Sequence, residues 1–203
     1  SRYAQADVTA LQKLLLRYLV PGSRVLEVGC GSGRDAHFLA SRGFSVTATD
    51  ASAEMLEVAR RASSTPAPDS ATGRGQPGNP GFLQVSFPLP PGATPLDERF
   101  DAVIALAVVM HVPDQELFEF AFQVRGRLEK GGTLILTASI GRAGLDGANR
   151  DGQGRLFRER PAGELRLLFE RLGFRFVAQH DAADGLGRPE VHWFTLVFRL
   201  DPT

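Results

Sequence analysis

The chain has 203 residues, and its 23 Lys and Arg balance 23 Asp and Glu, so the formal net charge is zero. This length suits one domain, residues 1–203, around one core, and the balanced charge gives no support for a DNA or membrane partner. Cys30 is the only cysteine, which excludes an internal disulfide. With no signal-peptide or membrane-spanning stretch, the sequence predicts a cytoplasmic protein, and no ligand spacing indicates a metal site.

The first part of the chain alternates helices and strands. Apolar residues at helical spacing predict a helix within residues 1–20, which Pro21-Gly22 ends. The elements predicted after it are a strand at 24–28, a helix at 36–40, a strand at 44–49 and a helix at 53–62. Together the two strands and the helix between them form one βαβ unit.

A segment rich in Pro, Gly, Ser and Asp follows, "SSTPAPDSATGRGQPGNPG" at residues 63–81. It has too few apolar residues to fold alone, so we expect a flexible surface insertion. A strand resumes directly after it, in "FLQVSF".

The second part repeats the alternation. Its predicted elements are a strand at 100–109, a helix at 114–128 stopped by Gly131-Gly132, a strand at 133–139, a loop at 140–160, a helix at 162–172, and strands at 174–180 and 191–200. The turn-rich "DAADGLGRP" between the last two strands predicts an antiparallel hairpin. Strands that alternate with helices predict a parallel sheet with right-handed crossovers.

The most informative motif is the glycine-rich turn after the first strand, Gly29-x-Gly31-x-Gly33. Glycines let the backbone approach a ligand closely at the start of a helix. The dinucleotide motif G-x-G-x-x-G needs its last glycine where Arg34 stands. Glu27 would repel a pyrophosphate but suits a cationic group. The turn therefore favours a positively charged cofactor over a dinucleotide.

"VLEVGCGSG" followed by "VTATD", then "ERFDAVIALAVVMHVP" and "LEKGGTLILTAS", resembles the class I methyltransferases that use S-adenosylmethionine. The resemblance covers roughly residues 24–139. It implies an α/β fold, a Rossmann-like three-layer sandwich whose mostly parallel seven-stranded sheet has an antiparallel last strand. It also implies S-adenosylmethionine as cofactor and S-adenosylhomocysteine as product.

The same resemblance assigns a cofactor site. The residues expected there are Glu27, Gly29, Cys30, Gly31, Gly33, Arg34, Asp50, Ala51, Met55, Ser86, Phe87, Ala105 and Leu106. The glycines line the methionine part with Glu27 near the ammonium, and Asp50 accepts the two ribose hydroxyls. Ser86 and Phe87 stand where many relatives carry an Asp or Asn that holds the adenine. Core packing is the alternative for the apolar positions, and a solvated helix residue is the alternative for Arg34.

The acceptor side is less defined by the sequence. His111 follows the fourth strand and is the candidate for a general base, with a packing role as the alternative. Tyr3 suits a lid, and Arg142 and Arg155 in the loop at 140–160 suit an anionic group on the acceptor. Trp193 and Phe194 are further aromatic candidates, for which packing is again the alternative.

The sequence thus predicts methyl transfer to a small-molecule O or N acceptor. An RNA-directed methyltransferase is an alternative, but the neutral chain shows no basic face. A non-catalytic S-adenosylmethionine-binding protein stays open, and a nicotinamide-dependent oxidoreductase is disfavoured by Arg34. The fourth strand lacks the Asn-Pro-Pro-aromatic motif of many base-modifying enzymes, which disfavours a DNA substrate. Acceptor identity and oligomeric state are not specified.

Overall fold

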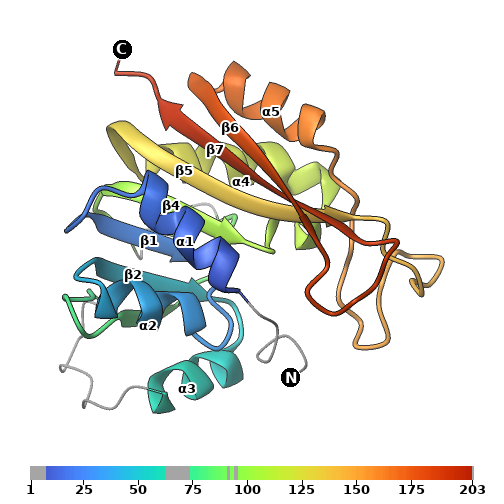
Figure 1. Ribbon diagram of the computed structural model, residues 1–203, viewed down its shortest axis with the longest axis horizontal. Coiled ribbons are helices and arrows are strands. Elements are labelled where there is room, and N and C mark those ends of the chain that lie inside the picture. Colours follow the sequence, from blue (N-terminus) through green and yellow to red (C-terminus); the bar gives the residue numbers. More distant parts are fainter. Residues whose placement is uncertain (1–7, 63–73, 91, 94–95, 203) are drawn as a thin grey trace.

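A computed structural model describes residues 8–62, 74–90, 92–93 and 96–202. Its centre is a seven-stranded sheet in the order β3-β2-β1-β4-β5-β7-β6. The strands run parallel except β7, which pairs antiparallel with both β5 and β6. Helices cover both faces of the sheet (Figure 1). The Rossmann-like three-layer fold and the terminal antiparallel hairpin expected from the sequence are therefore confirmed.

The elements alternate along the chain as the sequence predicts. The strands are β1 Arg24–Val28, β2 Ser45–Asp50, β3 Gly81–Gln84, β4 Phe100–Leu106, β5 Leu128–Ile140, β6 Phe174–Ala183 and β7 His192–Leu200. The α-helices are α1 Thr9–Tyr18, α2 Arg34–Ser41, α3 Ala53–Arg61, α4 Leu117–Gly126 and α5 Ala162–Arg171. Two short 3-10 turns, η2 Val109–His111 and η3 Asp114–Glu116, lie between β4 and α4.

The stretch from β4 to β5 departs most from the sequence prediction. The strand expected to reach residue 109 ends at Leu106, because Ala107 takes the left-handed conformation with φ +59°. The helix expected at 114–128 ends at Gly126, and Gly131-Gly132 lie inside β5 instead of stopping a helix. The glycines lie inside β5 because the pairing of β5 with β4 shifts in register. Leu128 already pairs with Phe100, the two glycines lie in the irregular segment that follows, and regular pairing resumes at Thr133.

Part of the insertion expected at residues 63–81 is packed against the domain. Residues 63–73 lie outside the described part of the chain. After them, Gln76 and Asn79 pair across a tight turn, and the Gly78 N–H donates to the Ala40 carbonyl at 2.8 Å. This end of the insertion is therefore held against the end of α2.

Two buried hydrophobic clusters hold the helices against the two faces of the sheet. One lies between the sheet and helices α4 and α5, around Phe120, Phe169 and Phe198. The other lies between the sheet and helices α1 to α3, around Leu15 and Leu39. Within the described residues, no helix is long and apolar enough to cross a membrane.

The loop after β5 and the β6–β7 hairpin project together at one end of the sheet (Figure 1). This is the edge where the parallel strands end. Ligands of open α/β sheets bind at that edge.

Candidate active site

The turn between β1 and α2 is built from three glycines in the left-handed conformation. Gly29, Gly31 and Gly33 have φ values of +70°, +54° and +74°. Gly33 is the N-cap of α2, and its N–H donates to the Cys30 carbonyl at 3.0 Å. Residues with a Cβ rarely adopt this conformation, so each position favours glycine.

Two of the glycines are also needed for close packing. A Cβ on Gly29 would lie 2.5 Å from Val108 Cγ2, and one on Gly33 would lie 2.8 Å from the Ala59 Cβ. The first contact joins the turn to the segment after β4, and the second joins it to α3. The turn is therefore seated between two neighbouring segments as well as shaped by its own backbone.

Glu27 lies under this turn and is almost fully buried, at 2% exposure. Its Oε2 has no hydrogen-bond partner among the described residues. Burial raises the pKa of Glu27 well above its ordinary value, and the nearby Asp35 carboxylate adds to the rise; the Arg34 guanidinium opposes it. A buried carboxylate oxygen without a donor is costly, so a cationic ligand group here would be stabilised.

Asp50, the last residue of β2, has a half-buried carboxylate that binds the turn itself. Its Oδ2 accepts the Gly31 N–H at 2.8 Å, and its Oδ1 accepts the Ser52 N–H at 2.9 Å. A carboxylate has about four acceptor positions, so both oxygens keep capacity for hydroxyl donors. The residue predicted to bind ribose thus also positions the glycine turn.

Two other cofactor candidates flank the turn. Arg34 opens α2, its Nη2 lies 3.2 Å from Asp35 Oδ2, and its side chain remains partly exposed. Cys30 is buried, and burial raises the pKa of its thiol. Contact of either residue with a cofactor stays a prediction.

The remaining predicted positions differ in exposure. Ala51 is exposed. Met55 is half-buried, and a Cβ on Gly31 would lie 3.6 Å from its Cε. Ser86 is exposed beyond the end of β3, whereas Phe87 packs against the α4 and α5 cluster. Ala105 is 1% exposed and belongs to the same cluster, and Leu106 packs from the opposite face. Packing therefore accounts for Phe87 and Ala105, and their cofactor contacts remain predictions.

Gln84, at the end of β3, was not singled out from the sequence. Its Nε2 donates to the Ala51 carbonyl at 3.2 Å, and the next residue, Val85, donates its N–H to the Asp50 carbonyl at 3.0 Å. These bonds bring the end of β3 against the end of β2. Only the sheet pairing of β2 with β3 places Gln84 there, and no motif signals it.

His111 lies in the 3-10 turn that follows β4. Its Nδ1 donates to the Leu156 carbonyl at 2.6 Å, because a carbonyl oxygen only accepts. This bond leaves Nε2 with a lone pair in the neutral ring. Burial lowers the pKa of His111 below its ordinary value. The hydrogen bond to Leu156 and the Asp151 carboxylate oppose this shift, and the Arg155 and Arg142 guanidinium groups add to it. The ring is therefore a neutral hydrogen-bond acceptor at physiological pH.

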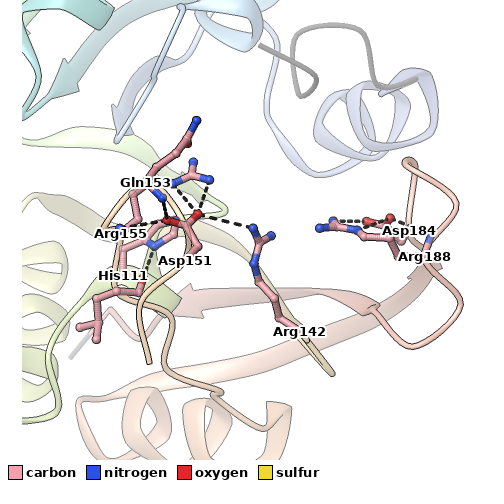
Figure 2. A network of polar contacts seen from close by, with 8 residues as sticks. His111, Arg142, Asp151, Gln153, Arg155, Asp184 and Arg188 are labelled. Atoms are coloured by element: carbon pink, nitrogen blue, oxygen red, sulfur yellow. Dashed lines mark hydrogen bonds and ion pairs between the residues drawn. The ribbon is translucent and has the colours of Figure 1, made fainter. Parts of the chain in front are cut away.

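The loop after β5 is organised by one carboxylate, Asp151. Arg155 donates to its Oδ2 from both Nε and Nη2, at 3.0 and 2.7 Å, and Arg142 Nη2 lies 3.5 Å from the same oxygen (Figure 2). The Arg155 side-chain hydrogen bonds, helped by the backbone N–H groups of Arg155 and Gln153, lower the pKa of Asp151 to about 2 against the opposing effect of burial. The Arg142 and Arg155 side chains predicted from the sequence are thus brought together, and both share an aspartate.

Tyr3, the predicted lid residue, lies outside the described part of the chain.

The turn between β6 and β7 carries a second such pair, which the sequence did not reveal. Arg188 donates from Nε and Nη2 to the Asp184 carboxylate at 2.9 and 2.8 Å, and Trp193 Nε1 donates to the same carboxylate at 2.9 Å. Asp184 and Arg188 are four residues apart in a loop, where spacing alone indicates no contact. Trp193 and the buried Phe194 also line a pocket of about 550 Å³ beside the hairpin.

A comparison with family models decides the affiliation. The model described as a methyltransferase domain matches residues 2–179. The chain belongs to this methyltransferase family.

Individual methyltransferases resemble the chain over shorter stretches. It is 32% identical to a ubiquinone biosynthesis O-methyltransferase of Xanthomonas campestris pv. campestris over 130 residues, covering 63% of the chain and 47% of the relative. It is 35% identical to the glycine N-methyltransferase of Rattus norvegicus over 94 residues, covering 46% of the chain and 30% of that protein. The chain thus spans about half or less of the length of these curated relatives.

Solved structures share the fold. A SAM-dependent methyltransferase from Methanosarcina mazei matches 94% of the chain and 98% of its own length, with a TM-score of 0.70 and 22% identity. At this identity the likeness establishes the three-layer architecture of the methyltransferase domain, and the chemistry has to be argued from the site.

Proposed function

We propose that this methyltransferase domain binds S-adenosylmethionine and transfers its methyl group to an oxygen or nitrogen of a small molecule. The observation that carries the proposal is the buried carboxylate of Glu27, two residues before the glycine turn, whose Oε2 has no donor among the described residues. Membership of the methyltransferase family supports the cofactor class.

The residues at the turn fit this cofactor. Its amino acid part carries an ammonium, which would supply the missing donor to Glu27. Its ribose carries two hydroxyls, and Asp50 has acceptor capacity beyond the N–H groups of Gly31 and Ser52. The left-handed glycines leave the backbone open for close approach. When bound, the sulfonium supplies an electrophilic methyl group, so the protein mainly has to align the acceptor.

His111 would act on the acceptor side. Its Nδ1 proton is engaged by the Leu156 carbonyl, so Nε2 can accept the proton that an acceptor hydroxyl or amine loses as its new bond to carbon forms. The ring is held edge-on to Phe157, with centroids 4.5 Å apart. A base fixed at two points keeps its orientation during the transfer.

Small-molecule acceptors are supported by the curated relatives, which are named ubiquinone biosynthesis O-methyltransferase and glycine N-methyltransferase. Both O- and N-methyltransferases are among them, so the acceptor atom stays open.

Calorimetry with S-adenosylhomocysteine and NADH tests the cofactor. We expect binding of the first and none of the second, and the opposite result contradicts the proposal. Incubation with methyl-labelled S-adenosylmethionine and a panel of phenols, amines and total RNA then tests transfer. Label in the small molecules supports the proposal. Label confined to RNA, or none with the cofactor bound, favours the RNA-directed or the non-catalytic alternative.

A further inference from the structure

We propose that Asp35, at the start of α2, is a second carboxylate that attracts the ammonium of the cofactor, and that Gln12 of α1 positions it. The inference rests on the proposed function, since it concerns the cofactor end of the same site. Neither residue was among the cofactor candidates predicted from the sequence.

Asp35 carries a carboxylate that is held inside the protein. Its side chain is only 8% exposed, although aspartate is seldom fully buried unless it is paired. It lies in the first turn of α2, where the helix dipole favours a negative charge. A buried carboxylate also needs hydrogen-bond donors. Asp35 obtains them from two helices.

Each oxygen of the Asp35 carboxylate has its own donor. Gln12 Nε2 donates to Oδ1 at 3.1 Å, and Arg34 Nη2 donates to Oδ2 at 3.2 Å. Gln12 belongs to α1 and stands 23 residues before Asp35. α1 and α2 cover the same face of the sheet (Figure 1). The Gln12 amide therefore fixes the Asp35 carboxylate from a helix outside the glycine turn.

Asp35 also lies close to Glu27. The backbone N–H of Ala36, the residue after Asp35, donates to the Glu27 carboxylate, so both acids meet at the first turn of α2. After burial, the charge of Asp35 is the largest cause of the raised pKa of Glu27. The two carboxylates therefore repel one another in the ligand-free site.

Three further groups face Glu27. The Arg34 guanidinium lowers the pKa of Glu27, the Asp50 carboxylate raises it, and the buried Cys30 thiol interacts with the Glu27 charge. Glu27 differs from Asp35 in one respect, since its Oε2 has no donor among the described residues. A cation that binds at this oxygen is therefore attracted by both carboxylates.

An ammonium beside Glu27 would offset the repulsion between the two acids, because an opposite charge favours the ionised form of a carboxylate. Asp35 thus acts in two ways. It makes Glu27 harder to ionise in the ligand-free site, and it attracts the ammonium once Glu27 is ionised. The first effect sets the pH at which the cofactor binds well, and the second sets the affinity above that pH.

The affinity for S-adenosylhomocysteine, measured by calorimetry from about pH 5 to about pH 9, tests both effects. In the intact chain the affinity should rise with pH as Glu27 ionises, and then level off. Asp35→Asn should move this rise to lower pH by about one unit and reduce the final affinity roughly fivefold. Gln12→Met keeps the length of the side chain but has no N–H, so it should cause part of both changes.

The neutral ligand 5′-methylthioadenosine is the matched control, because it shares the adenosine and the thioether but has no ammonium. Its affinity should not follow the ionisation of Glu27, and Asp35→Asn and Gln12→Met should leave it unchanged. Lys13→Gln, beside Gln12 on α1, and Asp201→Asn, after β7, replace exposed charges and should leave both ligands unaffected.

A role of Asp35 in the fold alone would weaken both ligands equally and leave the pH of the rise unchanged, and this result overturns the inference. Unchanged curves in the folded variants overturn it as well, and an unchanged curve in Gln12→Met alone overturns the role of Gln12. Circular dichroism checks folding. If Asp35→Asn does not fold, Gln12→Met tests the inference from the other helix.

The two proposals fail separately. If the intact chain does not bind S-adenosylhomocysteine at any pH, the proposed function is refuted and the inference falls with it. If the intact chain binds S-adenosylhomocysteine and the variants bind it with the same pH curve, only the inference is refuted.

Discussion

The Gly31 N–H donates to the Asp50 carboxylate, with N and Oδ2 2.8 Å apart. This single bond joins the turn after β1 to the end of β2. The same carboxylate accepts the Ser52 N–H, which lies just before α3. The proposed ribose acceptor therefore also sets the shape of the glycine turn and the entry to the next helix.

Replacing Asp50 by Asn should weaken binding of S-adenosylhomocysteine by more than tenfold. The amide offers one acceptor oxygen in place of two, so it cannot serve both backbone N–H groups and the ribose hydroxyls. Loss of a charged hydrogen bond corresponds to about 1.5–3 kcal/mol. Calorimetry measures the change, with Asp201→Asn, an exposed carboxylate after β7, as the control. Equal affinities of the two variants would contradict the ribose role.

Glu27→Gln should weaken cofactor binding but stabilise the fold at pH 8. The pKa of Glu27 is raised in the folded state, so its contribution is favourable below the unfolded pKa and is lost as pH rises through the folded value. At pH 8 the buried carboxyl group destabilises the fold, because burial opposes its ionisation and its Oε2 has no donor among the described residues, and its removal should add about 1 kcal/mol. Urea unfolding at pH 8 and pH 4 checks this, with the difference vanishing at pH 4.

Cofactor binding should also release a proton, because the ammonium favours the ionised form of Glu27. The release is largest between the ordinary pKa of Glu27 and its raised value in the ligand-free protein. Calorimetry in buffers of different ionisation enthalpy measures it, and Glu27→Gln should abolish the release. A release that persists in this variant would point to another group.

Most helices and strands follow from local sequence patterns, so the fold could be predicted from the sequence. β1 is a short apolar run that ends at a glycine turn, and its observed bounds match the predicted ones. The region between β4 and β5 was mispredicted because pairing across the sheet overrides local signals. Ala107 takes a positive φ against its own preference, since its N–H is held by the Thr137 side chain at 2.8 Å.

In the candidate site, too, local sequence patterns predict some residues, whereas others depend on contacts between distant segments. Glu27 and Asp50 lie next to strand ends, so a motif on one stretch of chain locates them. The Arg188 pair with Asp184 and the seating of Gly141 against Glu190 depend on how two loops meet. Loops carry no periodic pattern, so their contacts follow only from the folded chain.

Gly33→Ala should destabilise the domain by more than the conformational penalty of its left-handed backbone alone. The left-handed backbone costs about 1–2 kcal/mol for a residue with a Cβ, and the new Cβ would lie 2.8 Å from Ala59. Gly22→Ala separates the two effects, since its φ is +80° and nothing lies within 4 Å. Gly163→Ala, within α5 and in open space, should stabilise by about 0.5–1 kcal/mol. Thermal unfolding ranks the stabilities of the three variants. Equal losses of stability in Gly33→Ala and Gly22→Ala would argue against close packing of the turn.

His111→Asn should lower kcat about 10²–10⁴-fold, the range of general base catalysis. Asn keeps an N–H that can donate to the Leu156 carbonyl, but it cannot take up a proton at Nε2, so the variant separates the base from the positioning role. In the intact chain the pKa of His111 is lowered, and only the neutral ring acts as a base. The kcat should therefore rise with pH, with a midpoint below pH ~6.5, the ordinary pKa of histidine. The variant should lose this rise while its KM for the acceptor stays nearly constant. A variant that retains the parent's kcat and pH profile would assign His111 to packing.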